Sequence, residues 1–120
     1  MISSTERSQI QSYLSLPDDD LVVMAARDSV QHGFLRNRIK MAREKVTGAI
    51  DAARNHVCSN EAVRRAHSNH ADDHALIAAL LLALPVAFLK DNGISDALAF
   101  SILVARAGLS NLCRPVWTSP

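Results

Sequence analysis

A chain of 120 residues has room for one domain, and its apolar content of 48% lies in the range of globular proteins. Aromatic residues make up 4%, so a core has to come mainly from alanine and leucine, which suits closely packed helices. The formal net charge of +1 gives no argument for nucleic acid or an acidic substrate as a partner.

Two helices are expected at the beginning of the chain. The first runs from about Ser4 to Leu16, with a serine or threonine cap, and Pro17 ends it. The segment "PDDD" then places three aspartates before the apolar "LVVMAA", which is the pattern of a capped helix start. We expect this second helix over 19–31, before Gly33.

The third expected helix, over 34–57, is the longest and has the clearest pattern in the sequence. Its apolar positions recur at spacings of four and three, which predicts a heptad-like seam. Its other faces carry basic side chains, so we expect one narrow buried stripe and a basic back. The seam consists of Leu35, Ile39, Ala42, Val46, Ala49, Ala53 and His56.

Three further helices are expected after the break at "CSNEAV". A short helix runs through "EAVRRAH", and an apolar helix follows over 72–89. The turn "KDNG" leads into the last helix, over 95–108. We expect the last two helices to form an antiparallel hairpin, and 109–120 to be an irregular tail.

The expected fold class is all-α, because no segment has the alternating pattern of a strand. We expect a single domain over 1–120: a compact helical bundle of about five to six helices, with a long basic-backed third helix and an apolar C-terminal helical hairpin.

That hairpin has more apolar surface than one small bundle can easily cover. Residues 75–89 are apolar on every side, which is typical of a helix enclosed by its neighbours, and the second arm is nearly as apolar. The surplus predicts burial against a second copy of the chain. The residues expected to line this surface are Leu76, Leu80, Leu84, Phe88, Leu98 and Ile102.

The segment "HSNHADDH", over 67–74, holds the densest set of titratable side chains. In an unbroken helix its three histidines share one face, and zinc needs three or four such ligands. The serine, asparagine and aspartates are also good helix caps, and a bend there would separate the histidines. The candidate metal ligands are His67, His70, Asp73 and His74, with His56 or Cys58 as additional ligands.

The basic back of the third helix is a candidate face for a partner. Five basic side chains occur within ten positions, which could meet phosphates or an acidic protein. No aromatic residue is interleaved with them, so a solvated face is the simpler interpretation. These residues are Arg36, Arg38, Lys40, Arg43 and Lys45.

The expected function is a non-enzymatic interaction or regulatory module that self-associates through its apolar C-terminal helices and meets a protein partner. No nucleophile elbow and no glycine-rich phosphate loop occurs in the sequence, and no cofactor is indicated. Two alternatives stay open: a metal-binding protein that holds a divalent ion in the histidine segment, and a nucleic-acid-binding protein that uses the basic back.

The cysteine content and the apolar runs bear on location. Cys58 and Cys113 are too few for a disulfide scaffold, so we expect a reduced cytoplasmic protein, with one disulfide between them left open. The N-terminal segment lacks the pattern of a secretory signal. The longest charge-free apolar run, 75–89, is shorter than the ~20 residues of a membrane-spanning helix, so no membrane partner is expected.

Overall fold

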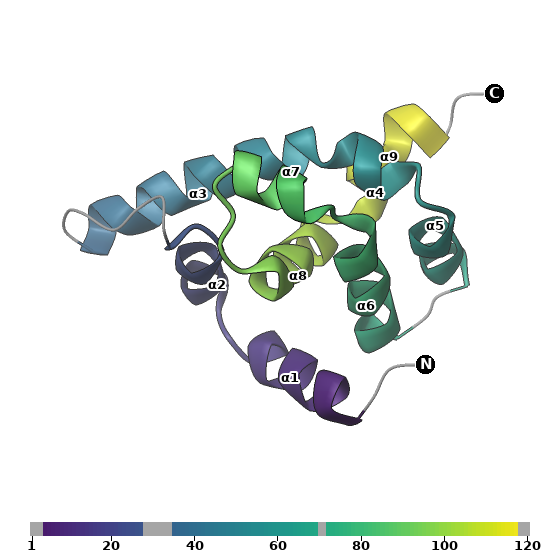
Figure 1. The fold of residues 1–120 in the computed structure, drawn as a ribbon, viewed down its shortest axis with the longest axis horizontal. Coiled ribbons are helices and arrows are strands. Elements are labelled where there is room, and N and C mark those ends of the chain that lie inside the picture. Colours follow the sequence, from purple (N-terminus) through teal and green to yellow (C-terminus); the bar gives the residue numbers. More distant parts are fainter. Residues whose placement is uncertain (1–3, 28–34, 70–71, 118–120) are drawn as a thin grey trace.

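The computed structural model describes residues 4–27, 35–69 and 72–117, which form nine α-helices and contain no strand (Figure 1). The predicted all-α class is therefore confirmed for the described residues, with more and shorter helices than expected. The helices are α1 (Ser4–Leu14), α2 (Asp18–Ala25), α3 (Leu35–Ala52), α4 (Arg54–Cys58), α5 (Glu61–Ser68), α6 (Asp73–Ala83), α7 (Val86–Asp91), α8 (Ala97–Ala107) and α9 (Leu109–Trp117).

Side-chain caps fix the beginnings of α5, α6 and α8. Asn60, Asp72 and Asp96 each accept a hydrogen bond from the backbone amide three residues further on, at 3.1, 2.8 and 3.1 Å. Such a cap satisfies one of the amides that a helix start leaves without a partner. The predicted helix start after "HSNH" is thus confirmed, because α5 ends at Ser68 and α6 begins at Asp73.

Two of the expected helices are each divided into two. The helix expected over 34–57 is interrupted at Ala53, between α3 and α4. The helix expected over 72–89 is interrupted at Leu84, whose backbone is extended, and Pro85 precedes α7. A proline disfavours the helical conformation of the residue before it and has no amide to donate, which explains the second interruption.

The seam of α3 is buried over most of its predicted length. Ala42, Val46, Ala49 and Ala53 are all at most 3% exposed, as expected. After the interruption the pattern of buried positions shifts by one residue. His56 is therefore exposed, and Val57 of α4 is buried instead. The side chains of Leu35 and Arg36 lie outside the described part of the chain.

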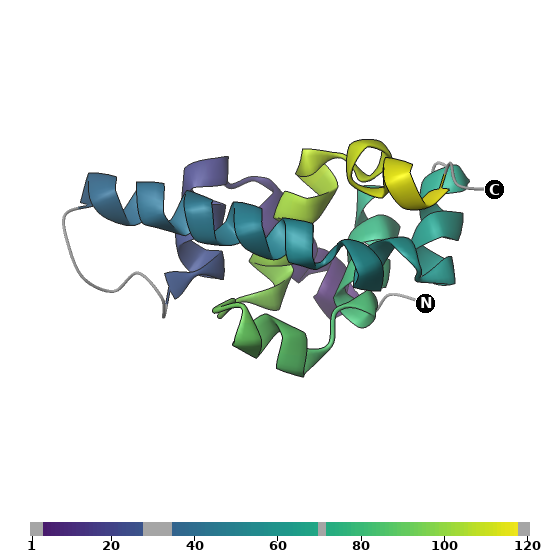
Figure 2. The same ribbon diagram turned by 90° about the horizontal axis from the view of Figure 1, so that it is seen from above.

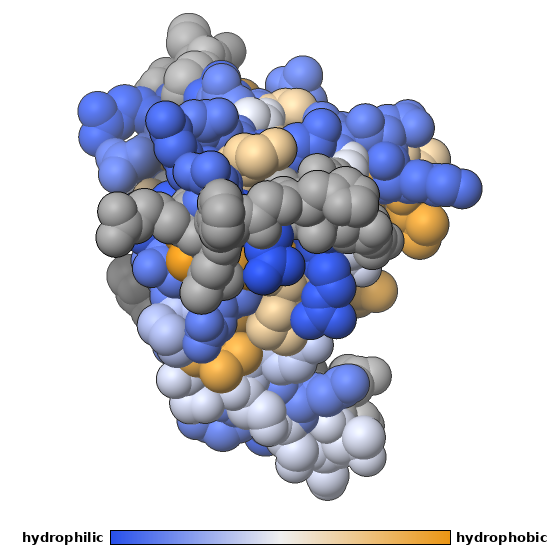
Figure 3. All heavy atoms as spheres, turned by 90° about the vertical axis from the view of Figure 1, so that its left-hand side faces the viewer, coloured by the Kyte–Doolittle hydropathy of each residue, from blue (hydrophilic) through white to orange (hydrophobic). Residues whose placement is uncertain are grey.

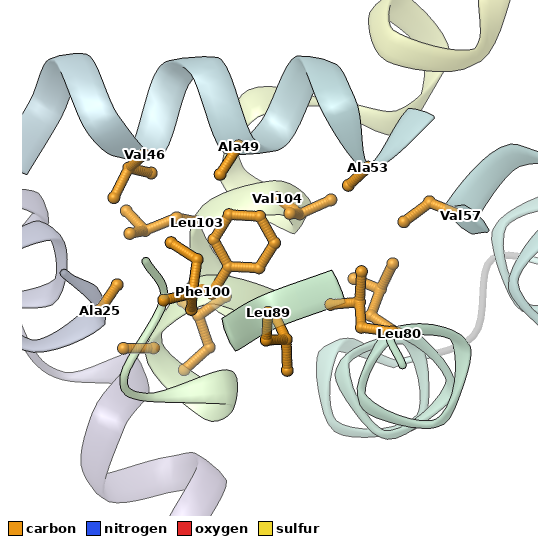
Figure 4. Packing of buried hydrophobic residues seen from close by; sticks show 14 of the residues in the cluster. Ala25, Val46, Ala49, Ala53, Val57, Leu80, Leu89, Phe100, Leu103 and Val104 are labelled. Atoms are coloured by element: carbon orange, nitrogen blue, oxygen red, sulfur yellow. The ribbon is translucent and has the colours of Figure 1, made fainter. Parts of the chain in front are cut away.

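The core is built around α8 rather than around the segment 75–89. Six successive residues of α8, from Ala99 to Val104, are buried, and α8 contacts α1, α2, α6 and α9. In Figure 4 the Phe100 ring lies between the α3 seam and Leu89 of α7. The expectation that 75–89 is the enclosed helix is wrong, because Leu82 of α6 is 89% exposed.

The segment after α8 is a helix and not the irregular tail expected over 109–120. Gly108 ends α8 with a positive φ of 97°, which glycine adopts readily, and α9 begins directly after it. Leu109, Leu112 and Cys113 of α9 are buried at helical spacing. Figure 2 shows α9 packed near α4, at the end of the molecule opposite the beginning of α3.

Among the described residues, the core contains one polar side chain without a hydrogen-bond partner. Ser101 of α8 is completely buried, and its hydroxyl forms no hydrogen bond with a described residue. We expect Ser101→Ala to raise the free energy of unfolding by about 1 kcal/mol, because the variant no longer buries an unsatisfied hydroxyl. Urea unfolding measures this, with Ser12→Ala on exposed α1 as the control for helix propensity; an equal gain in both variants would contradict the burial explanation.

Candidate functional site

An apolar groove of about 570 Å³ lies between α1, α6 and the beginning of α8. We call it the α1–α6 groove. Most of its lining side chains are apolar, and Gln9, Asp96 and the Tyr13 hydroxyl are polar. The residues that line it are Gln9, Ile10, Tyr13, Ala78, Leu81, Leu82, Asp96, Ala97 and Leu98.

A hydrogen bond joins two walls of this groove. The Tyr13 hydroxyl of α1 donates to Oδ2 of Asp96 at 2.9 Å, while the other oxygen of Asp96 caps α8. The bond to the carboxylate is the main cause that raises the pKa of Tyr13 above its ordinary value, and burial adds to it. One carboxylate therefore fixes α1 against the beginning of α8.

Two large apolar side chains near the junction of α6 and α7 are exposed, and one of them, Leu82, lines the groove. Leu82, near the end of α6, is 89% exposed, and Val86, at the beginning of α7, is 80% exposed. We call this pair the Leu82–Val86 ridge. The other large apolar side chains that are exposed among the described residues, Met41 at 48% and Val116 at 38%, are much better covered.

The six residues predicted for self-association divide into two groups. Leu80, Leu84 and Ile102 are buried in the core of the chain itself, so they cannot contact a second copy. The other three, Leu76, Phe88 and Leu98, are partly buried against that core, and Leu98 also lines the groove. Leu82 and Val86 are not among the predicted residues, because a continuous helix across Pro85 places other side chains on its outer face.

The described histidines of the segment 67–74 face different elements. His67 of α5 lies against Trp117 of α9, with ring centroids 5.2 Å apart, and its Nε2 is 3.1 Å from Ser110 Oγ. His74 of α6 has its Nε2 3.1 Å from the side-chain oxygen of Gln11 on α1. His67 therefore contacts α9, whereas His74 contacts α1.

The aspartates of that segment belong to the beginning of α6. Asp72 accepts the Ala75 amide, which is the main cause that lowers the pKa of Asp72, and Arg7 at 3.6 Å lowers it further. Asp73 is exposed in the first turn of α6. His70 lies outside the described residues.

The other two suggested metal ligands have different neighbours. His56 is exposed and makes an edge contact with Phe88, with ring centroids 5.0 Å apart. Cys58 forms a disulfide. Across 4–27, 35–69 and 72–117, no three His, Cys, Asp or Glu side chains are grouped as a metal site. The divalent-metal alternative stays a prediction that depends on His70.

The basic back of α3 is partly neutralised by α2. Arg43 pairs with Asp19 of α2, while Lys40 and Lys45 are exposed. Arg38 is partly buried, and its Nε has no hydrogen-bond partner in the described part of the chain. Figure 3 views the side of the molecule where α2 and the beginning of α3 lie, and hydrophilic side chains cover much of it.

A disulfide and two hydrogen bonds hold α9 against α4. Cys58 and Cys113 are joined, which corrects the expected reduced pair. The Trp117 indole donates to the carbonyl oxygen of Cys58 at 2.9 Å, and Arg54 Nε donates to that of Leu112 at 2.8 Å. We call this arrangement the α4–α9 clasp.

Comparisons with known proteins give no relative for this chain. No family model matches the sequence, and no curated protein or solved structure matches it significantly. None of the helices described here has both the length and the apolar character needed to cross a membrane.

Proposed function

We propose that this protein is a non-enzymatic helical interaction module that self-associates through the Leu82–Val86 ridge and the α1–α6 groove. The observation that supports this most strongly is the exposure of Leu82 at 89%, in the wall of an apolar groove, and of Val86 at 80%, at the beginning of the next helix. Exposed apolar surface at a groove is typical of association sites.

The ridge and the groove suit a twofold arrangement. In a dimer with a twofold axis the same patch serves both copies, so the ridge of each copy can enter the groove of the other. Leu82 itself lines the groove, so the ridge and the groove share this residue. Burying a leucine or valine side chain contributes about 1.5–3 kcal/mol, and a dimer buries two of each.

The partner face of this module is the basic back of α3. Lys40 and Lys45 are exposed there, and an acidic protein surface would complement them. The Cys58–Cys113 disulfide favours an oxidising compartment over the expected cytoplasm, because disulfides persist mainly in oxidising compartments.

Sedimentation velocity over a wide range of protein concentration tests the self-association. We expect the wild-type chain to shift from monomer to dimer as its concentration rises. Leu82→Glu is expected to remain monomeric, because a carboxylate on the ridge would be buried without a partner. Met41→Glu, at an exposed position of α3, is the matched control and should dimerise like the wild type.

Two results would count against the proposal. One is a wild-type chain that sediments as a monomer at every concentration. The other is equal dissociation by Leu82→Glu and Met41→Glu, which would place the interface elsewhere or indicate a general effect of added charge.

A further inference from the structure

A second pocket, separate from the α1–α6 groove, opens beside the α4–α9 clasp. It has a volume of about 550 Å³ and lies between α5 and the ends of α4 and α9. Cys58 of the disulfide forms part of its wall and is 3% exposed, whereas Cys113 is 0% exposed. Of the two cysteines, Cys58 is therefore the one that a small molecule in the pocket would meet first.

The pocket is positively charged. Arg64 and Arg65 of α5 line it together with one carboxylate, Glu61. Arg65 pairs with Glu61 at 3.3 Å, while Arg64 is exposed and forms no ion pair with a described residue. The net positive charge favours the approach of an anion, and the attacking species in thiol–disulfide exchange is a thiolate.

Polar and apolar contacts hold α9 in place together with the disulfide. The hydrogen bonds of Trp117 and Arg54 connect it to α4, and His67 of α5 contacts Trp117 and Ser110. Leu109 and Leu112 of α9 are buried. The disulfide is the covalent link between this short helix and α4, so its reduction removes the strongest single constraint on the position of α9.

We propose that the Cys58–Cys113 disulfide is a thiol–disulfide exchange site that dithiols reach through this pocket, and that its reduction releases α9 from α4. A thiolate of the dithiol attacks Sγ of Cys58, the bond to Cys113 breaks, and Cys113 leaves as a thiolate that takes up a proton. The second thiolate then attacks the sulfur of the reagent bound to Cys58. The reagent becomes a disulfide, Cys58 leaves and is protonated, and the protein has gained two electrons and two protons.

Release of α9 would change the surface of the molecule. The inner side of α9 carries Leu109 and Leu112, and α9 packs on α4, where Val57 is buried. All three would become exposed, while the core around α8 keeps its contacts with α1, α2 and α6. The reduced chain would thus present a second apolar surface that the oxidised chain hides.

The test uses the full chain without denaturant and dithiothreitol as the dithiol. Thiol content is followed by mass spectrometry after alkylation, and amide hydrogen exchange is measured segment by segment. We expect complete reduction of the native protein and a larger acceleration of exchange in 109–117 than in α2, α3 and α8. Arg64→Glu should slow the reduction several-fold, whereas Lys45→Glu, which changes the same charge on remote α3, should not.

Several results would overturn this inference. Reduction that requires denaturant would show that the pocket gives no access to Cys58. Equal rates for Arg64→Glu and Lys45→Glu would remove the role of the positive pocket. Exchange in 109–117 that is unchanged after reduction, or accelerated no more than in α2, α3 and α8, would show that the disulfide does not hold α9 specifically.

Discussion

Replacing Phe100 with alanine is expected to lower the free energy of unfolding by about 3–5 kcal/mol. Phe100 is 0% exposed and lies in the first half of α8, between the α3 seam and α7 (Figure 4). Its removal leaves a cavity that helices on several sides would have to close, and the loss of buried area adds to that cost. Urea unfolding followed by circular dichroism measures the change.

Phe88→Ala is the matched control for this prediction. Phe88 of α7 is partly exposed and contacts His56 at the surface, so the same truncation there removes less buried area. The loss in Phe88→Ala should be clearly smaller. Equal losses at Phe100 and Phe88 would contradict the central position of α8.

Removing the disulfide is expected to have the second large effect on stability. The cross-link joins residues 55 apart, and chain-entropy estimates range from ~3 kcal/mol for a loop of about 15 residues to ~4.7 kcal/mol for about 100. The double variant Cys58→Ala/Cys113→Ala should lose an amount within that range in urea unfolding, because its unfolded chain is less restricted.

The wild-type chain in excess reductant provides the control, since it lacks the cross-link but keeps both sulfur atoms. Its stability should fall to nearly that of the double variant. A double variant as stable as the oxidised wild type would show that Cys58 and Cys113 are not cross-linked in solution.

Features that depend on neighbouring residues were predictable from the sequence. The cap of α6 at Asp72 follows from its place directly before an apolar run. The buried seam of α3 follows from spacings of three and four along one helix, as at Ala42, Val46 and Ala49. Both patterns are local, so the tertiary structure did not change them.

Features that depend on distant parts of the chain were not predictable in the same way. Both segments 75–89 and 97–105 are apolar, and the contacts of α1, α2, α6 and α9 make α8 the central one. Likewise, the sequence predicts an irregular segment where α9 is a helix. This helix is stabilised by burial against α4 and by the bond from Cys113 to Cys58, and neither contact is visible in the local sequence. Composition does not reveal such pairings.

The sequence predicts an apolar interaction surface on the C-terminal helices, but it does not identify the residues that are exposed there. The apolar surplus of the C-terminal helices indicated an exposed patch, yet Leu80 and Leu84 lie in the core. Pro85 ends α6 and changes the direction of the chain, so a helical wheel drawn across it cannot identify Leu82 and Val86 as the exposed pair. A helix boundary at Pro85 places the faces of α6 and of α7 in separate helices, as the structure does.

Hydrogen exchange at low and high protein concentration tests the proposed self-association most directly, because it shows where a second copy binds. Protection should increase with concentration in α1, in α6 and α7 around Leu82 and Val86, and at the beginning of α8. Exchange in α3 should not change. Exchange that is independent of concentration throughout the chain, or protection that increases in α3 instead, would contradict the proposed surface.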